Sequence, residues 1–154
     1  MSKNFTMLVG LPGCGKTTYR KEKCQNIVEI SSDDFIEKMA SDSGLTYNEV
    51  FKEQVKNATC GASSMFVKAV AEGRDIVWDQ TNLTKKKRMG ILDQLPNDYI
   101  KTCVVFNISE DVLIKRRAGR DGKTIPEGIL RSMKSSFEQP CPSEGWDYVM
   151  EITN

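Results

Sequence analysis

Eight residues near the start of the chain, GLPGCGKT at Gly10–Thr17, carry the most specific chemical signal in the sequence. They satisfy the pattern G-x-x-x-x-G-K-[ST], with an apolar strand expected before them at Phe5–Val9 and a polar helix expected to start near Gly15 or Lys16. Glycines let such a loop wrap its backbone N–H groups and the helix N-terminus around a polyphosphate. The pattern therefore predicts a phosphate-binding loop, or P-loop, that holds a nucleotide.

Individual residues of this loop have distinct expected roles. Lys16 brings a point charge to the β- and γ-phosphates, and the Thr17 hydroxyl ligates Mg²⁺. We expect Lys16 to be surface-directed and unpaired when no nucleotide is bound. Cys14 either gains thiolate character from the surrounding N–H groups or, as we favour, fills space as a small residue. The expected nucleotide-binding set here is Gly13, Cys14, Gly15, Lys16, Thr17 and Thr18.

Two neighbouring carboxylates, Asp33 and Asp34, follow a second short apolar segment at Ile27–Ile30. The chain contains no histidine, so catalytic proton transfer would fall first to a carboxylate. Asp34 with Glu37 fits a capping box, because an Asp N-cap can accept from the N–H at the third helical position. Asp33 is not needed for that cap, and we therefore treat Asp34 as mainly structural.

Further polar stretches follow the later strands. A third strand, Asp75–Asp79, runs into QTN, and Asp79 looks like the acid that elsewhere in P-loop folds holds Mg²⁺ through water. Basic residues gather in KKKR, Lys85–Arg88, which is either a solvated face or a contact to a nucleic-acid backbone. They gather again in KRRAGR, Lys115–Arg120, whose arginines either lie at a solvated helix end or have a functional role. A phosphotransferase needs a base facing the acceptor hydroxyl, positive charge on the transferred group and exclusion of water. These stretches can supply those parts.

Strand and helix patterns alternate along the chain. The remaining strands are expected at Cys103–Ile108 and Trp146–Ile152, and helices are expected at 35–40, 47–71, 84–95, about 110–118 and 126–137. The alternation predicts an α/β fold, a three-layer sandwich around a mostly parallel five-stranded sheet. In such sheets, ligands bind beyond the carboxyl ends of the strands.

Composition limits the classes of protein to which the chain can belong. A chain of 154 residues with 39% hydrophobic and 28% charged residues is typical of one globular domain, here 1–154. The 22 basic and 21 acidic residues nearly cancel, so any attraction for nucleic acid must come from a local basic patch. No run of about 18 apolar residues and no secretory signal is present, so we expect a cytoplasmic protein without a membrane partner. The five cysteines include no CxxC pair, which argues against a disulfide framework and a zinc site.

Five stretches taken in order, GLPGCGKTT, SSDDF, WDQTNL, KRRAGRDGKTIP and ILRSM, resemble the kinase domain of the phage-type 5′-polynucleotide kinases, which repair broken RNA or DNA ends. The resemblance covers nearly the whole chain. It implies transfer of the γ-phosphate of ATP, with Mg²⁺, to the 5′-hydroxyl of a nucleic-acid end, which we expect to be single-stranded. Both a monomer and a homo-oligomer fit the sequence.

The resemblance also implies roles for single residues. Asp33 would be the general base, which agrees with the cap assigned to Asp34, while Arg116 and Arg120 would lie over the ATP phosphates in an arginine-containing lid at about 115–126. The implied acceptor-binding residues are Asp33, Thr81, Asn82, Ile125 and Ile129. Thr81 would contact a phosphate of the acceptor, and the two isoleucines would pack against its base.

Magnesium is expected at Thr17, with Asp33 or Asp79 acting through water. The chain departs from the family example at two positions, since Ile36 replaces an arginine and Gln80 replaces a carboxylate. These changes bear on acceptor recognition more than on phosphoryl transfer. No D-x-D-G-T signature follows, so no phosphatase domain is expected.

Several alternatives stay open. RNA and DNA both expose a 5′-hydroxyl, so the sequence does not choose between them. A kinase of free nucleosides, sugars or nucleotide sugars would use the same P-loop, base and lid with a different acceptor pocket. A non-catalytic ATP-binding module would use the P-loop alone as a conformational switch.

Overall fold

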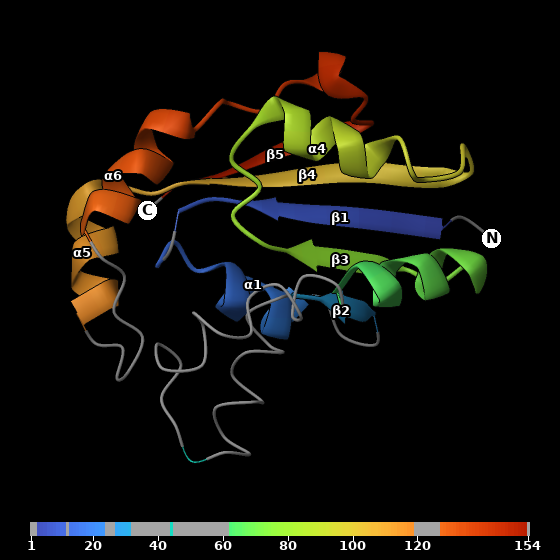
Figure 1. The fold of residues 1–154 in the computed structure, drawn as a ribbon, viewed down its shortest axis with the longest axis horizontal. Coiled ribbons are helices and arrows are strands. Elements are labelled where there is room, and N and C mark those ends of the chain that lie inside the picture. Colours follow the sequence, from blue (N-terminus) through green and yellow to red (C-terminus); the bar gives the residue numbers. More distant parts are fainter. Residues whose placement is uncertain are drawn as a thin grey trace.

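The computed structural model describes residues 3–11, 13–23, 27–31, 44, 62–118 and 127–153 (Figure 1). Residues 62–71 form a helix that precedes β3. The other elements, in chain order, are β1 Lys3–Val9, α1 Lys16–Lys23, β2 Val28–Ile30, β3 Ile76–Asp79, α4 Lys85–Leu92, β4 Tyr99–Asn107, α5 Glu110–Ala118, α6 Glu127–Ser136, the 3₁₀ turn η1 Pro142–Glu144 and β5 Tyr148–Thr153. Within this described part, no helix is long and apolar enough to span a bilayer.

The five strands form one sheet in the order β2-β3-β1-β4-β5 (Figure 1). Every pairing between the described strands is parallel, which confirms the expected α/β sheet. In the register of β1 with β3, Met7 lies opposite Trp78 and Leu8 lies opposite Asp79. Strands β1 and β3 therefore end side by side, and the loops that follow them start from one edge of the sheet. We call this edge the carboxyl edge and define it by the P-loop, Trp78 and the loop 80–84.

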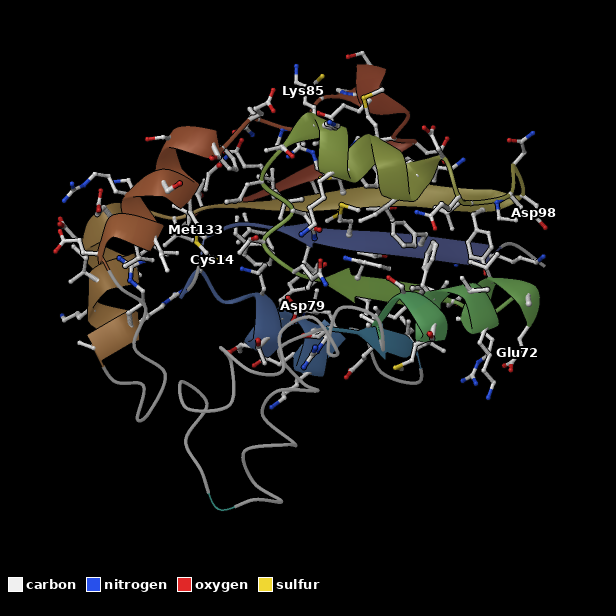
Figure 2. All side chains as sticks on the ribbon, in the orientation of Figure 1. Cys14, Glu72, Asp79, Lys85, Asp98 and Met133 are labelled. Carbon is white, nitrogen blue, oxygen red and sulfur yellow. The ribbon has the colours of Figure 1, made fainter. Side chains whose placement is uncertain are left out.

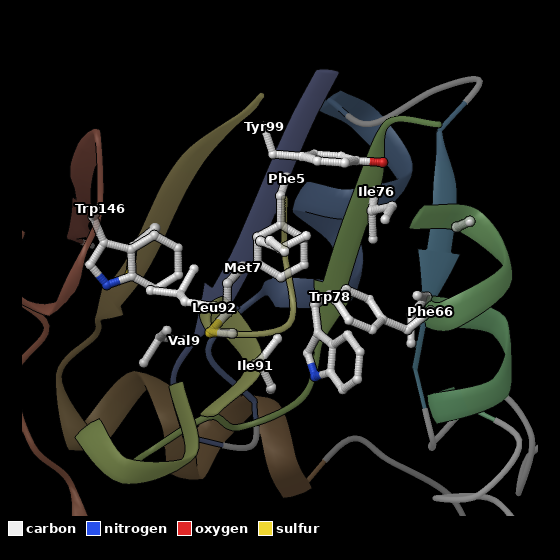
Figure 3. Packing of buried hydrophobic residues seen from close by; sticks show 14 of the residues in the cluster. Phe5, Met7, Val9, Phe66, Ile76, Trp78, Ile91, Leu92, Tyr99 and Trp146 are labelled. Carbon is white, nitrogen blue, oxygen red and sulfur yellow. The ribbon is translucent and has the colours of Figure 1, made fainter. Parts of the chain in front are cut away.

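Side chains alternate between the two faces of the sheet because successive residues of a strand point in opposite directions. On one face, Phe5 and Trp78 pack with Phe66 of the helix 62–71 and with Ile91 of α4 (Figure 3). The edge of the Trp78 ring meets Phe66 at a centroid distance of 5.1 Å. The opposite face has a separate cluster whose buried members are Leu8, Cys14, Val77, Val104, Phe106 and Leu113. The second cluster thus joins the sheet to the P-loop and α5.

Among the strand boundaries, the start of β4 differs most from expectation. β4 begins at Tyr99, earlier than the expected start at Cys103. Pairing with β1 continues back to the Lys3 and Tyr99 pair, and the Tyr99 hydroxyl donates to the carbonyl of Arg74 at 2.7 Å. Lys101 and Thr102 interrupt the apolar run there, so hydropathy marks only the second half of the strand. The expected helix 35–40 and the part of 47–71 before residue 62 lie outside the described residues.

Candidate functional site

The P-loop has a backbone shape that only glycine accepts readily at two positions. Gly13 and Gly15 have φ angles of 88° and 101°, in the left-handed region that disfavours residues with a Cβ. A Cβ on Gly13 would lie 3.1 Å from Cγ of Arg117 and 3.2 Å from the Leu113 carbonyl oxygen, and one on Gly15 would lie 3.2 Å from Nη1 of Arg116. Helix α5 therefore packs directly on the loop and brings arginines to it.

The ammonium group of Lys16 is held by its own loop. Nζ donates to the carbonyl of Gly10 at 2.8 Å and to that of Leu11 at 3.3 Å, and it lies 3.5 Å from Sγ of Cys14. The prediction that Lys16 would be unpaired without a nucleotide was therefore wrong. An ammonium has three donors and no acceptor, so it binds the nearest carbonyls when no phosphate is present.

The side chain of Cys14 points into the fold. It is 2% exposed and belongs to the cluster on the α5 face of the sheet. This burial favours the interpretation of Cys14 as a small packing residue. Its backbone, rather than its thiol, is then the part that can face a phosphate.

Arg116 comes from the last turn of α5 and reaches the loop. Its Nη1 donates to the carbonyl of Gly13 in a long hydrogen bond of 3.4 Å, while much of the side chain stays exposed. The two basic groups that sequence and resemblance assigned to the phosphates, Lys16 and Arg116, thus both contact backbone carbonyls of the P-loop. Arg120 and the rest of the expected lid after Ala118 lie outside the described residues.

A buried ion pair links α1 to the end of β3. Arg20 is 2% exposed, and its Nη1 lies 3.2 Å from Oδ2 of Asp79, which is 6% exposed. Nε of Arg20 lies 3.5 Å from Oε2 of Glu29 in β2. Asp79 lies at the carboxyl end of β3, as expected (Figure 2), but with a counter-charge that sequence reasoning missed. No signal in the uniformly polar sequence of α1 marked Arg20 as buried.

The loop after β3 is tied to the start of the P-loop. The backbone N–H of Gly10 donates to the carbonyl of Thr81 at 3.1 Å. Asn82 has a φ of 50° and no exposed surface, and its Nδ2 donates to the carbonyl of Leu8 at 2.8 Å and to that of Gln80 at 3.1 Å. Asn82 therefore holds the ends of β1 and β3 together. Asn82 is fully buried in the free protein, so its expected role as an acceptor contact stays a prediction, whereas Thr81 is half-buried beside the P-loop.

The last residue of the KKKR run is not on the surface. Arg88 is 0% exposed and lies on the inner side of α4. Nε and Nη2 donate to the two carboxylate oxygens of Glu144 at 2.8 and 3.0 Å, while Nη1 donates to the carbonyls of Asn82 and Leu83 at 2.9 and 3.0 Å. Nη2 also donates to the carbonyl of Glu138 at 2.8 Å. Arg88 is therefore neither part of a solvated face nor a phosphate contact, and both predictions are wrong for this residue. Either prediction still fits the three exposed lysines of the run.

Trp146 completes this group, because its Nε1 donates to Oε1 of Glu144 at 3.1 Å. We call Arg88, Glu138, Glu144 and Trp146 the arginine cluster. Burial alone would raise the pKa of Glu144, but hydrogen bonds from Arg88 and Trp146 and the charge of Arg88 outweigh it and lower that pKa. The cluster thus clamps the loop 80–84 to the segment before β5.

The remaining expected site residues have mixed positions. Thr17 and Thr18 are exposed at the start of α1, where a ligand can reach them. Ile129 is 47% exposed on α6, a helix tied to α5 by an ion pair between Lys134 and Glu110. Asp33 and Ile125 lie outside the described residues.

The loop suits the phosphates of a nucleotide, because its glycine positions leave no room for side chains and a lysine and an arginine adjoin it. Among the described residues, no group of three acidic, cysteine or histidine side chains could hold a metal ion alone. Thr17, exposed at the loop, is a ligand type that fits Mg²⁺ carried by a nucleotide.

Comparisons with known proteins agree with this geometry. Among curated proteins, the chain is 26% identical over 145 residues to an L-seryl-tRNA(Sec) kinase from Methanococcus maripaludis, covering 92% of this chain and 55% of that protein. The chain thus spans about half the length of that relative.

Solved structures of other proteins are similar in fold, among them the following two. A candidate kinase from Chloroflexus aurantiacus gives a TM-score of 0.72 at 18% identity, covering 99% of this chain and 85% of the other. A chain of the Pnkp1/Rnl/Hen1 RNA repair complex gives a TM-score of 0.66 at 22% identity, covering 88% and 44% of the two chains.

The family comparison covers most of the sequence. Residues 5–140 match the AAA_33 family, described as an AAA domain. The matched range contains the P-loop, the loop 80–84 and the helices α4 and α5. The chain therefore belongs to the AAA_33 family and has the fold of a P-loop kinase.

Proposed function

We propose that this protein is an ATP-dependent polynucleotide 5′-hydroxyl kinase. The observation that carries the proposal is the hydrogen bond from the Gly10 N–H to the Thr81 carbonyl. Through this bond, Thr81, which is expected to contact the acceptor, lies next to the P-loop, which is expected to hold the donor. A kinase requires this proximity, because phosphoryl transfer depends mainly on positioning and on charge stabilisation.

On the donor side, the P-loop binds the phosphates, and Lys16 exchanges its loop carbonyls for phosphate oxygens. Arg116 adds charge from α5 and stabilises the negative oxygens of the transferred group. Mg²⁺, when bound with the nucleotide at Thr17, would neutralise further phosphate charge.

On the acceptor side, Asp33 takes the proton of the 5′-hydroxyl. The hydroxyl oxygen forms a bond to the γ-phosphorus of ATP, and the bond from that phosphorus to the bridging oxygen of ADP breaks. An ordinary Asp pKa is sufficient for this step, because the transition state of phosphoryl transfer is loose. Thr81 contacts the phosphate that follows the reacting nucleoside.

Positive charge for the nucleic-acid backbone comes from Lys85, Lys86 and Lys87. All three are exposed and begin α4, directly after the loop that carries Thr81. Backbone contacts of this kind give a salt-dependent affinity. Arg88 does not contribute, because all of its donors bind Glu144 or backbone carbonyls inside the fold.

A second candidate acceptor is the serine hydroxyl of seryl-tRNA. The similarity to the archaeal L-seryl-tRNA(Sec) kinase over 92% of this chain favours it. Both candidates place the reacting hydroxyl on a molecule with a nucleic-acid backbone, so the exposed lysines serve either one.

A panel of acceptors tests the proposal. Purified protein is incubated with Mg²⁺ and γ-labelled ATP together with 5′-hydroxyl RNA, 5′-hydroxyl DNA, seryl-tRNA, gluconate or shikimate. The two small compounds are included because a gluconokinase and a shikimate kinase share the fold. We expect label on the 5′ ends. Transfer to seryl-tRNA alone, or to a small compound alone, would replace the proposed acceptor.

The roles of the two aspartates are tested separately. We expect Asp33→Asn to keep ATP binding and lose most transfer, whereas Asp34→Asn loses little, because Asn is as good an N-cap as Asp. Activity of Asp33→Asn with inactivity of Asp34→Asn would exchange the two roles. Full activity of both variants would exclude a catalytic carboxylate at this pair.

A further inference from the structure

A buried polar atom remains without a partner at the end of β3. Trp78 is 6% exposed, and its Nε1–H has no hydrogen-bond partner in the part of the chain that the structure describes. An indole N–H is a donor only, and buried tryptophans usually satisfy it. Trp146 does so, although it is buried to nearly the same extent at 5% exposure.

The position of Trp78 suggests what could satisfy it. Trp78 precedes Asp79, the last residue of β3, and so belongs to the carboxyl edge, where parallel sheets bind ligands. Figure 3 shows the indole between Phe66 and Ile91, with the nitrogen at the edge of the ring nearer Ile91. Packing from both sides fixes the direction of this donor. A second buried atom without a described partner, Oδ1 of Asn82, belongs to the loop that follows the same strand.

The nucleotide phosphates are not the expected partner, because the P-loop and Trp78 pack on opposite faces of the sheet. Cys14 of the P-loop and Leu113 of α5 pack in the cluster on one face, whereas Trp78 packs in the cluster on the other. A group that meets the Trp78 nitrogen therefore approaches from the side of the helix 62–71 and α4. In a kinase, the substrate other than the nucleotide is the phosphoryl acceptor.

We propose that the Trp78 N–H donates a hydrogen bond to an oxygen of the phosphoryl acceptor and so helps to select it. Trp78 is then a specificity-determining residue rather than a catalytic one. The inference rests on the proposed function only in taking the second substrate to be a hydroxyl-bearing acceptor.

The first test is kinetic. Trp78→Phe keeps an aromatic ring against Phe66 and removes only the donor and part of the ring volume. We expect the KM for a short 5′-hydroxyl RNA oligonucleotide to rise about tenfold, with kcat and the KM for ATP changed less than about twofold, since one hydrogen bond is lost. Trp146→Phe is the matched control and should leave all three constants within about twofold, because its partner is Glu144.

The second test keeps Trp78 intact. The chain has two tryptophans, so in Trp146→Phe all tryptophan emission comes from Trp78. We expect 5′-hydroxyl RNA, added without ATP, to shift or quench this emission, and ATP alone to leave it nearly unchanged. This readout works even if Trp78→Phe fails to fold.

The outcomes separate the inference from the proposed function. A response of Trp78 emission to seryl-tRNA or a sugar acid, but not to 5′-hydroxyl RNA, would keep Trp78 as an acceptor contact while the proposed acceptor fails. Phosphorylation of RNA with an unchanged acceptor KM in Trp78→Phe would overturn the inference and keep the function. Unchanged emission with every acceptor of the panel would also overturn the inference.

Discussion

The arginine cluster and the carboxyl edge are adjacent, and both contain buried polar groups, but they use these groups differently. In the arginine cluster, the five N–H donors of Arg88 make five hydrogen bonds, and Trp146 donates to Glu144. At the carboxyl edge, Lys16 binds carbonyls of its own loop, and the Trp78 nitrogen has no partner among the described residues.

This difference separates structure from function. A buried network that satisfies itself has nothing left for a ligand, and removing one member costs stability. Polar groups that bind only their own loop, or that have no partner, lower the stability of the free protein. Such groups can gain partners from a substrate. We therefore expect changes in the arginine cluster to affect unfolding, and changes at the carboxyl edge to affect catalysis.

The largest effect on activity is expected at Lys16. Lys16→Ala should abolish phosphoryl transfer, because no other described side chain carries positive charge from within the P-loop. Its free energy of unfolding should change by less than about 1 kcal/mol, because only partly exposed bonds to carbonyls are lost. Transfer assays and urea denaturation measure the two quantities. An active Lys16→Ala protein would remove the P-loop from the mechanism.

The next largest effect on activity is expected at Arg116, which is exposed at the P-loop, whereas Arg88 is buried in the arginine cluster. Arg116→Ala should lower turnover by about 10³-fold, in the range seen for arginines that stabilise the transferred phosphoryl group. The side chain is exposed and makes one long hydrogen bond, so folding should hardly change. Lys115→Ala, an exposed neighbour on the same helix, is the control. Turnover within a few-fold of the parent would end the assignment of Arg116 to the phosphates. Arg120→Ala tests the remainder of the expected lid in the same assay.

Arg88 should show the opposite pattern. Arg88→Met leaves Glu144 buried and unpaired, and we expect the free energy of unfolding to fall by about 3–5 kcal/mol in urea denaturation. Arg88→Met combined with Glu144→Gln should recover part of this loss, because no buried charge remains unpaired. If the single variant does not fold, Arg88→Lys, which retains the charge with fewer donors, should show a smaller loss. Equal stability of parent and Arg88→Lys would contradict a structural role.

The sequence predicted the backbone elements that form the site better than it predicted the partners of the side chains. The P-loop was predictable because glycine and lysine at fixed spacing serve one backbone shape, and the five strands because their apolar runs are short and regular. The adjacency of Thr81 and the P-loop followed from parallel topology.

The sequence could not predict that Arg88 is buried whereas Lys85 is exposed. Both stand in one run of four basic residues, and hydropathy treats them alike. The difference arises because Glu144, distant in sequence, offers a carboxylate under α4 on the side that Arg88 occupies. Arg20 was missed for the same reason, since its partner Asp79 comes from another element. A single sequence gives the charges but not these long-range pairs.

Acid should weaken the arginine cluster specifically. The folded pKa of Glu144 is lowered from its ordinary value of 4.5, so its contribution to stability is present above that value and is lost as the pH falls through the folded pKa. Glu144→Gln should cost about 1–3 kcal/mol at neutral pH and show a smaller further loss below pH 4.5 than the parent. Denaturation at a series of pH values measures both. Parallel stability profiles for the two proteins would show that Glu144 does not titrate as assigned.

The smallest and most direct contrast is between the two tryptophans. Trp146→Phe and Trp78→Phe remove the same atoms from sites of similar burial, so the loss of packing is comparable and largely cancels. Trp146→Phe also breaks a hydrogen bond to a buried carboxylate, whereas Trp78→Phe removes a donor without a described partner. We therefore expect Trp146→Phe to be the less stable variant by about 1–2 kcal/mol in the absence of substrate. Adding the acceptor should stabilise the parent more than Trp78→Phe, because only the parent gains the hydrogen bond. If Trp78→Phe were instead as unstable as Trp146→Phe without substrate, its nitrogen would already be satisfied in the free protein, and the two regions would not differ in the way proposed.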